Sequence, residues 1–376
     1  MAGADALINR SDHVAVIGAG VSGCALASGL RHNGFDGEIS LWEAGRGPGG
    51  RCATRRSRVD PSWRLDHGAP LFNISGLEPL PLLETLETGG WIEPWTGTIG
   101  RLDSQGNFQL KVSAPLTEGF LYRGCGGSDG LCRGLLATAR GLIDSHYGVL
   151  VRRLERTADG QWQLFGALGE QLAVVNWLLL SGTLLAHPRS VAVMGWSDIP
   201  LRQAADADPA LGQALEAIAT LSYVPRSNLL LRFEAEAALA WRALPFQLLQ
   251  FADSPQRHWG WQRLSIQPLP DGRCGVVLHT DATVSDGQDQ AWIQQQYHRL
   301  METLAIWLGP APLPAADRSL MRWRAAFPLP PGLDIATMLC PSSQIAFCGD
   351  GVAGPGQGRV EGALRSGLAL CEQLLG

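Results

Sequence analysis

Apolar and polar positions near the start of the chain follow the pattern of a strand, a helix and a second strand. Residues 13–18 read HVAVIG, a short apolar run that suits a strand buried on both faces of a parallel sheet. Residues 21–32 contain many small residues and end at Asn33-Gly34, which is typical of a helix and its stop signal. The next strand is expected at 39–43. This order predicts one strand-helix-strand unit of about thirty residues.

Helical and strand-like patterns alternate less regularly in the central part of the chain. Residues 77–116 have mixed periodicity, which indicates an insertion that forms a first piece of a second domain. Helices are expected at 130–142, 199–221 and 289–308. Short strands recur through 149–181, with a turn signal at Asp159-Gly160, and are expected again at 228–233, 247–251 and 274–279.

The end of the chain returns to alternating strand and helix. Residues 344–348 read as a buried strand, 349–358 as a glycine-rich loop and 360–375 as a helix. No internal repeat or low-complexity linker separates these parts, so two interwoven domains explain the order better than two consecutive ones.

Composition narrows the class of protein. The chain has 376 residues, of which 45% are hydrophobic and 17% charged, enough apolar material for a large core. The net charge is −5 and no run of Lys or Arg occurs, so no nucleic-acid partner is expected. The eight cysteines form no CxxC pair, which predicts buried thiols and no metal site. Apolar runs fall short of the ~20 residues of a membrane span, and no targeting segment is recognised, so a cytoplasmic protein is expected.

A glycine motif lies where the first strand turns into the first helix. Gly18 permits a tight turn, Gly20 lets the backbone approach a diphosphate, and Gly23 lets the helix pack closely on the strand. The helix start then presents unpaired N–H groups and a positive dipole end to that diphosphate. Glu43 ends the second strand, where its carboxylate can accept hydrogen bonds from ribose hydroxyls. The motif predicts a dinucleotide site and leaves FAD and NAD as alternatives.

Three further segments carry a resemblance to a known family. Residues 47–54 read GPGGRCAT, residues 66–72 read DHGAPLF, and Gly349-Asp350 precedes GRVEGALRSG at 358–367. Together with the glycine motif, they resemble the glutathione-reductase-type flavoproteins, in particular the amine-oxidase-like superfamily. The sequence departs from the family's second segment at His67 and Pro70, which affects the fine shape of the flavin pocket.

The resemblance implies FAD as the cofactor and assigns residues to it. The segment from Gly49 to Arg51 would lie beside the diphosphate and flavin, and Asp350 on the ribitol or diphosphate. The backbone from Val360 to Ala363 would lie near the pyrimidine edge, where a helix start stabilises the negative charge of a reduced flavin. The complete expected set is Gly18, Gly20, Val21, Ser22, Gly23, Glu43, Ala44, Gly49, Gly50, Arg51, Ala69, Pro70, Val151, Gly349, Asp350, Val360, Glu361, Gly362 and Ala363.

Within that superfamily, the chain most resembles the renalase branch. The resemblance rests on GGRCATRR at 49–56, VVLH at 276–279, MRWR at 321–324 and RVEGALRSG at 359–367. It implies oxidation of a reduced or isomeric nicotinamide nucleotide of the NAD(P)H type, by hydride transfer to flavin N5, with oxygen as acceptor and hydrogen peroxide as product. It also implies an α/β fold with a discontinuous Rossmann-like FAD-binding domain and a second, α+β substrate domain on a mostly antiparallel sheet. The expected boundaries are 12–76, 120–190 and 319–376 for the first domain, and 77–119 and 191–318 for the second.

Candidates for lining the substrate space are His67, His279 and Trp323, with Trp259 and Trp261 as stacking surfaces. For each histidine the alternative is a hydrogen-bonded structural role. Other functions stay open: a flavin amine oxidase, an isoprenoid desaturase-like enzyme, or a non-catalytic FAD-binding or sensing protein. Amine oxidases of this superfamily usually place a lysine near flavin N5, and the only lysine here is Lys111, in the insertion.

Overall fold

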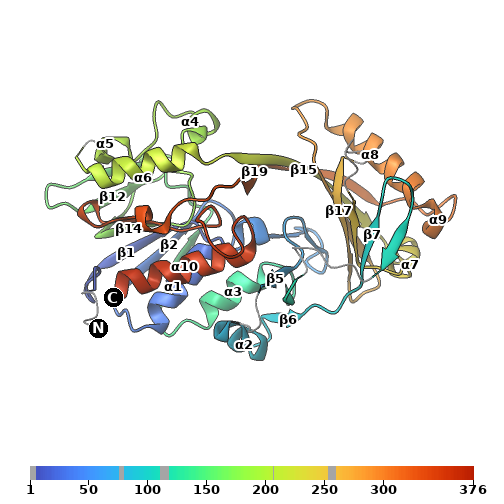
Figure 1. The fold of residues 1–376 in the computed structure, drawn as a ribbon, viewed down its shortest axis with the longest axis horizontal. Coiled ribbons are helices and arrows are strands. Elements are labelled where there is room, and N and C mark those ends of the chain that lie inside the picture. The colour runs from blue at the N-terminus through green and yellow to red at the C-terminus, as the bar shows by residue number, and fades with distance from the viewer. Residues whose placement is uncertain (1–5, 76–79, 111–117, 206, 253–259) are drawn as a thin grey trace.

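The computed structural model describes residues 6–75, 80–110, 118–205, 207–252 and 260–376. Two large sheets lie at opposite ends of an elongated molecule, and the C-terminus lies beside the first of them (Figure 1). Two long strands, β15 (Tyr223–Phe233) and β19 (Asp317–Pro328), run from the region between the sheets into the second sheet.

The first sheet has six strands in the order β10-β2-β1-β14-β21-β20. All its pairs are parallel except that of β20 with β21. The strands are β1 (His13–Ile17), β2 (Glu38–Glu43), β10 (Asp144–Tyr147), β14 (Trp177–Leu180), β20 (Leu339–Cys340) and β21 (Ile345–Phe347).

Both faces of the central strands β1, β14 and β21 are buried, which is why these strands read as apolar runs, whereas the edge strand β10 has no buried residue. On β1, Val14 and Val16 belong to one hydrophobic core, whereas Ala15 belongs to another on the opposite face. The first core is completed by the helices α1 (Val21–His32), α2 (Pro81–Thr88), α3 (Gly130–Ala137) and α10 (Val360–Leu375). The second is completed by α6 (Pro209–Thr220) and by an antiparallel sheet of β11 (Arg153–Arg156), β12 (Trp162–Phe165) and β13 (Gln171–Val175) (Figure 1).

The second large sheet has seven strands in the order β19-β15-β18-β17-β16-β7-β8. Its pairs are antiparallel except that of β7 with β16. Besides β15 and β19, the strands are β7 (Ile99–Leu102), β8 (Phe108–Leu110), β16 (Leu248–Phe251), β17 (Trp261–Pro268) and β18 (Cys274–Thr280). One face packs in a core with α7 (Ala235–Arg242), α8 (Asp289–Thr303) and α9 (Ala305–Leu308).

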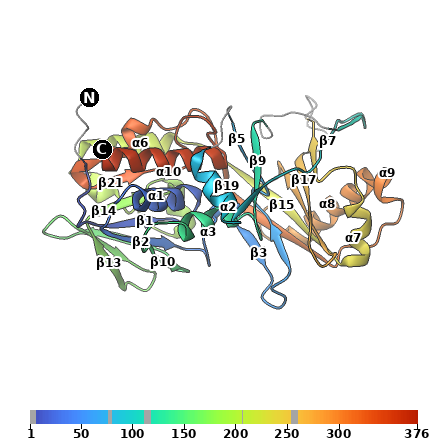
Figure 2. The same ribbon diagram turned by 90° about the horizontal axis from the view of Figure 1, so that it is seen from below.

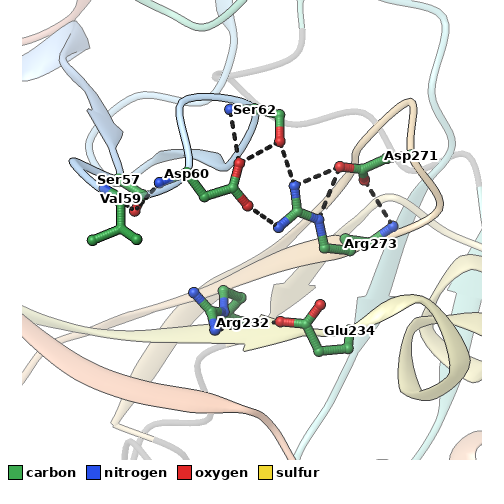
Figure 3. Close-up of polar contacts among 8 residues, drawn as sticks. All are labelled: Ser57, Val59, Asp60, Ser62, Arg232, Glu234, Asp271 and Arg273. Atoms are coloured by element: carbon green, nitrogen blue, oxygen red, sulfur yellow. Dashed lines mark hydrogen bonds and ion pairs between the residues drawn. The ribbon is translucent and has the colours of Figure 1, made fainter.

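The other face of the seven-stranded sheet is partly covered by a hairpin of β3 (Thr54–Arg56) and β4 (Arg64–Asp66), which Figure 2 shows beside the sheet. Trp63 and Leu65 of the hairpin pack against Leu230 and Val277. The turn of the hairpin is tied to the sheet by Arg273, which pairs with Asp60 and donates to Ser62 Oγ at 2.6 Å (Figure 3).

A small antiparallel sheet lies between the two large ones. It consists of β5 (Phe72–Ile74), β9 (Phe120–Gly124) and β6 (Ile92–Pro94), with β9 in the middle. The insertion expected at 77–116 is therefore divided among three places, because α2 packs in the first core, β6 joins this small sheet, and β7 and β8 join the seven-stranded sheet.

Most expected elements are confirmed, including the first strand-helix-strand unit and the terminal strand and helix. Other expectations differ from the structure. The helix expected at 130–142 ends at Ala137, the one at 289–308 breaks at Leu304, and the one at 199–221 is divided into α5 (Arg202–Ala205) and α6. The strand β17 was not expected, nor was β19 expected to be a strand.

Two expected domain boundaries fall inside structural units. The boundary at 319 cuts through β19, which pairs along its length with β15 in the seven-stranded sheet. Residues after 190 were assigned to the substrate domain, but α6 packs on the six-stranded sheet, below α4 (Arg189–Met194) in Figure 1. None of the described helices combines the length and the apolar character that crossing a membrane requires.

Candidate functional site

A cavity of about 630 Å³ extends from the six-stranded sheet to the seven-stranded sheet. Its volume is in the range of small-molecule and cofactor sites, ~300–1,000 Å³. At one end it is lined by the loops after β1, β2 and β21 and by the start of α10. At the other end it is lined by residues of β15, β17, β18 and β19.

The loop after β1 forms a tight turn against which α1 packs. Gly18 has φ +103°, a conformation that residues with a Cβ rarely adopt. A Cβ on Gly23 would lie 2.0 Å from Gly18 O and 2.7 Å from Ser181 Oγ, so only glycine allows this approach. A Cβ on Gly20, by contrast, would meet no described atom within 4 Å, so Gly20 borders free space.

The start of α1 offers unpaired N–H groups at this end of the cavity. Gly20 is the N-cap residue, and no described side chain caps the helix. Val21 and Ser22 of the first turn line the cavity. We refer to such a helix start, uncapped and beside the cavity, as an open start; it favours an anionic ligand.

A second glycine loop, at 49–50, packs against the loop after β1. Gly49 N donates to Ala19 O at 2.8 Å, and Gly49 forms an isolated bridge with Gly20. A Cβ on Gly50 would lie 3.1 Å from Gly20 Cα, and Gly50 has φ +55°. The two loops thus make one continuous glycine surface, whose close contact side chains would prevent.

Glu43 lies beside this surface and holds its backbone. Its Oε2 accepts a hydrogen bond from Ala19 N at 2.8 Å, and its Oε1 accepts one from Gly45 N at 2.6 Å. Each carboxylate oxygen has a further lone pair. Glu43 therefore fixes the turn and still presents an acceptor to the cavity that it lines.

Arg51 and Asp350 join the N-terminal and C-terminal parts of the site. The guanidinium donates two hydrogen bonds of 2.6 Å to the two carboxylate oxygens, and a third of 3.1 Å to Ala326 O. Asp350 is buried, and it follows Gly349, whose φ is +150°. Bidentate pairs of this kind fix both partners in one orientation. The pair therefore holds the loop at 49–51 against the loop at 349–351.

The start of α10 is a second open start, since no described side chain caps it. Val360 and Ala363 line the cavity, whereas the intervening residues point away from it. Glu361 is fully buried, and its carboxylate accepts hydrogen bonds from Ser75 N at 3.1 Å and Arg365 Nε at 2.9 Å. A Cβ on Gly362 would lie 2.3 Å from Gly356 O. These two residues position the helix start and do not border the cavity.

Most of the expected cofactor residues are brought together on this one cavity. Those that line it are Gly18, Gly20, Val21, Ser22, Glu43, Ala44, Gly49, Gly50, Arg51, Ala69, Val151, Gly349, Asp350, Val360 and Ala363. Gly23, Glu361 and Gly362 do not line it, because they pack against the backbone or side chains behind it. Pro70 lines a second, smaller cavity of about 310 Å³.

The far end of the cavity contains two of the three expected substrate-lining residues. His279 and Trp323 border it, but His67 does not. The ring of His67 stacks on Trp323 with centroids 5.3 Å apart, and its carbonyl oxygen accepts from Trp323 Nε1 at 3.3 Å. Burial, with a smaller effect of Arg55, lowers the pKa of His67 to about 4, so this ring is neutral at pH 7. His67 therefore supports Trp323 from behind.

The stacking surface expected at Trp261 is not part of the cavity. Trp261 lies on the opposite face of the sheet, in the core under α8, where its Nε1 donates to Gln296 Oε1 at 2.7 Å. Trp259 and Lys111 lie outside the described residues.

Several polar residues of the cavity were not anticipated, among them Arg189, Arg226, Asn228 and Arg263. The Arg189 guanidinium lies 4.3 Å over the ring of Tyr223. Among these four, only Asn228 gave a signal in the sequence, because it directly precedes the apolar run Leu229–Leu231 of the strand expected at 228–233. A polar residue in a buried strand is a candidate for a site.

Comparison with known proteins supports the fold. Residues 16–80 match a family described as an NAD(P)-binding Rossmann-like domain. No curated protein sequence matches the chain significantly.

Solved structures match over almost the whole chain. Cyclohexylamine oxidase from Brevibacterium oxydans IH-35A has a TM-score of 0.65 at 15% identity, over 97% of this chain and 99% of that one. An oxidoreductase from Methanosarcina mazei has a TM-score of 0.63 at 14% identity, over 96% of this chain and all (100%) of that one. Putrescine oxidase bound to putrescine has a TM-score of 0.60 at 16% identity, over 96% and 98%. At such identities the likeness establishes the fold: a Rossmann-like part together with a mostly antiparallel sheet.

Proposed function

We propose that this chain is an FAD-dependent oxidoreductase that holds the dinucleotide along the six-stranded sheet and its substrate against the seven-stranded sheet. One observation carries the proposal. The open starts of α1 and α10, more than 300 residues apart in sequence, border one continuous cavity. Two positive helix ends in one cavity favour an extended ligand with negative charge at two places. A diphosphate joined to a flavin is a ligand of this kind.

The residues present fit such a cofactor. A Cβ on Gly20 or on Gly349 would meet no described atom within 4 Å, so the backbone at both places can closely approach a ligand. Glu43 offers an acceptor for ribose hydroxyls, and the Arg51–Asp350 pair fixes the two loops between which the middle of the ligand would lie. The chemistry supplied at this site by a bound FAD would be that of a hydride acceptor at N5, with oxygen as the final electron acceptor and hydrogen peroxide as the product.

The chain's own contribution to the reaction is to orient the substrate and to exclude water. Trp323 offers a flat surface in the cavity, fixed by its contacts with His67. His279 is buried, and burial, together with the charge of Arg263, holds its pKa well below its usual value. A histidine in this environment stays neutral at pH 7 and serves as a hydrogen-bonding group for the substrate.

The proposed substrate is a reduced or isomeric nicotinamide nucleotide. Support comes from the resemblance to the renalase branch, since two of the segments that carry it, at 276–279 and 321–324, place His279 and Trp323 at the cavity. A second candidate, amine oxidation, is favoured by the likeness of the fold to cyclohexylamine oxidase and putrescine oxidase.

The proposal is tested in two steps. The absorption spectrum of the purified protein, before and after acid precipitation, reports whether flavin is bound and whether it is released. Anaerobic mixing then identifies the electron donor: reduced nicotinamide isomers should bleach the flavin rapidly, and putrescine or cyclohexylamine should not. Bleaching by the amines alone would favour the second candidate, and bleaching by neither would favour a sensing role. A protein that stays colourless after incubation with excess FAD would refute the proposal altogether.

A further inference from the structure

A β-bulge aims two consecutive residues of β17 at the cavity. The register of β17 with β18 places Trp261 opposite Thr280 and Arg263 opposite His279, so Gln262 is an extra residue in its strand. Trp261 and Leu264 face the core under α8, whereas Gln262 and Arg263 both line the cavity. In a regular strand, neighbouring residues would point to opposite faces. Bulges are frequent next to active sites because they redirect side chains in this way.

Arg263 differs from the other arginines around the cavity. Arg51 is paired with Asp350, and Arg226 with Asp281 at 3.1 Å. The Arg263 side chain makes no hydrogen bond or ion pair with any described residue, and its Nε is buried without a partner among them. Burial lowers the pKa of Arg263 to about 10, which leaves it positively charged at pH 7. A partly buried cation whose Nε is out of contact with water is costly unless something neutralises it.

His279 supplies a second unpartnered donor next to Arg263. Asn228 Nδ2 lies 3.1 Å from His67 O and 3.2 Å from His279 Nδ1. Because a carbonyl oxygen only accepts, the Asn228 amide nitrogen must face it, and the same nitrogen donates to His279 Nδ1. The proton of the neutral ring is therefore on Nε2, which is buried and has no partner among the described residues.

These three side chains form one row across the sheet. Asn228 on β15 is opposite His279 on β18, which is opposite Arg263 on β17. Side chains at paired positions of adjacent strands lie next to each other on the same face. The row therefore presents a guanidinium and an imidazole N–H side by side to the cavity.

The charges around the cavity also favour an anionic ligand. Among the described residues that line it, arginines outnumber carboxylates: Arg51, Arg189, Arg226, Arg263 and Arg359 against Glu43 and Asp350. Asp281, two residues after His279 in the sequence, already pairs with Arg226 and accepts from Gln262 Nε2 at 3.0 Å.

We propose that Arg263 and His279 bind an anionic group of the substrate, a carboxylate or a phosphate, and that this pair selects anionic substrates over cationic ones. The guanidinium matches either anion by two parallel hydrogen bonds, and His279 Nε2–H adds a third. The inference rests on the proposed function, because it assigns the substrate end of the same cavity. It makes a free amine, which is a cation at pH 7, an unsuitable substrate.

The test is calorimetric titration of the FAD-saturated protein with sodium acetate, inorganic phosphate and propylamine. Excess FAD occupies the dinucleotide end of the cavity, so that phosphate does not bind there. We expect acetate or phosphate to bind and propylamine not to bind. The anion that binds more tightly identifies the substrate group: acetate indicates a carboxylate, and inorganic phosphate indicates a phosphate. Arg263→Gln should weaken that binding at least tenfold, and Arg263→Lys, which keeps the charge but loses the planar fork, should weaken it less.

Arg101→Gln is the matched control, because Arg101 is an exposed arginine of the same sheet and its loss should leave anion binding unchanged. Circular dichroism verifies that each variant is folded, and the partial recovery in Arg263→Lys excludes a mere loss of folding. Unchanged anion affinity in Arg263→Gln would overturn the inference, as would absence of anion binding by the wild-type protein or tighter binding of propylamine. Flavin content is measured separately by absorbance, so a failure of the proposed function is distinguishable from a failure of the anion site.

Discussion

Two glycines of the first loop should respond to the same added methyl group in opposite ways. In Gly23→Ala, the new Cβ would lie 2.0 Å from Gly18 O and within 2.8 Å of the Ser181 side chain. An ordinary contact is at least 3.4 Å, so α1 and the loop must separate by more than an ångström. In Gly20→Ala, the methyl group would meet no described atom within 4 Å, and Gly20 has φ −73°, which alanine adopts readily.

The expected magnitudes follow from these contacts. Overpacking costs about 1–3 kcal/mol, and Gly23→Ala should lie at the upper end because the atom it meets is backbone. For a chain of 376 residues, this corresponds to a fall in melting temperature of roughly 4 °C. Gly20→Ala should change the free energy of unfolding by less than about 1 kcal/mol. Its methyl group, however, occupies the space into which the diphosphate would fit, so the Kd for FAD should rise at least tenfold, about 1.4 kcal/mol.

The assay separates stability from binding. Thermal unfolding is followed by circular dichroism in the absence of FAD, because a bound ligand would itself raise the melting temperature. FAD affinity is then measured at low temperature by quenching of flavin fluorescence. If Gly20→Ala bound FAD as tightly as the wild type, the loop would not contact the diphosphate, and the assignment of this end of the cavity would be wrong. If Gly23→Ala melted at the wild-type temperature, the close packing of α1 on the loop would be refuted.

Two further predictions concern residues outside the cavity. Glu361→Ala removes the buried acceptor of Ser75 and Arg365, and it should lower the free energy of unfolding in urea by about 2–3 kcal/mol. The loss is smaller than for a fully buried ion pair because Arg365 is 33% exposed. A loss under about 1 kcal/mol would contradict a structural role of Glu361. Arg273→Gln should release the hairpin turn, so that a protease cuts there faster than in the wild type. Enzymatic activity is the control and should stay unchanged, because Arg273 does not line the cavity. Hydrogen bonds from Arg273 and then Ser62 lower the pKa of Asp60 from its usual 3.8 to about 2, so the attachment is complete above pH 3.8 and is lost as the pH falls through about 2. Hydrogen exchange that loosened the turn already at pH 5 would refute this.

Local patterns were sufficient for the dinucleotide end of the site. The first strand, the glycine turn and α1 lie within twenty residues, and each requirement is local: apolar residues for a strand buried on both faces, and glycine where φ is positive or a helix approaches closely. The terminal helix was equally clear, because its buried positions recur with helical periodicity. The family resemblance at the two ends of the chain then indicated that these segments act together.

The sequence did not reveal the substrate end of the cavity, because apolar and polar residues do not alternate regularly in its strands. β17 carries a bulge at Gln262, and its partly polar face lines a cavity instead of packing in a core. β19 also departs from regular pairing with β15, and most of its residues are partly buried on both faces. Neither strand therefore shows the alternation of apolar and polar residues, with a period of two, that predicts a strand from the sequence. His67 was assigned to the cavity by its place in the sequence, whereas the fold puts it behind Trp323.

The sequence by itself determined the Rossmann-like βαβ unit, the glycine turn after β1 and the places where α1 and α10 begin, because these depend on the conformational preferences of neighbouring residues. Tertiary structure alone decided which distant groups meet: Arg51 with Asp350, and Asn228 with His279 and Arg263. These contacts depend on strand register, in which a shift of one residue moves every side chain to the opposite face. No local pattern encodes that choice, since it is made by the packing of the whole sheet.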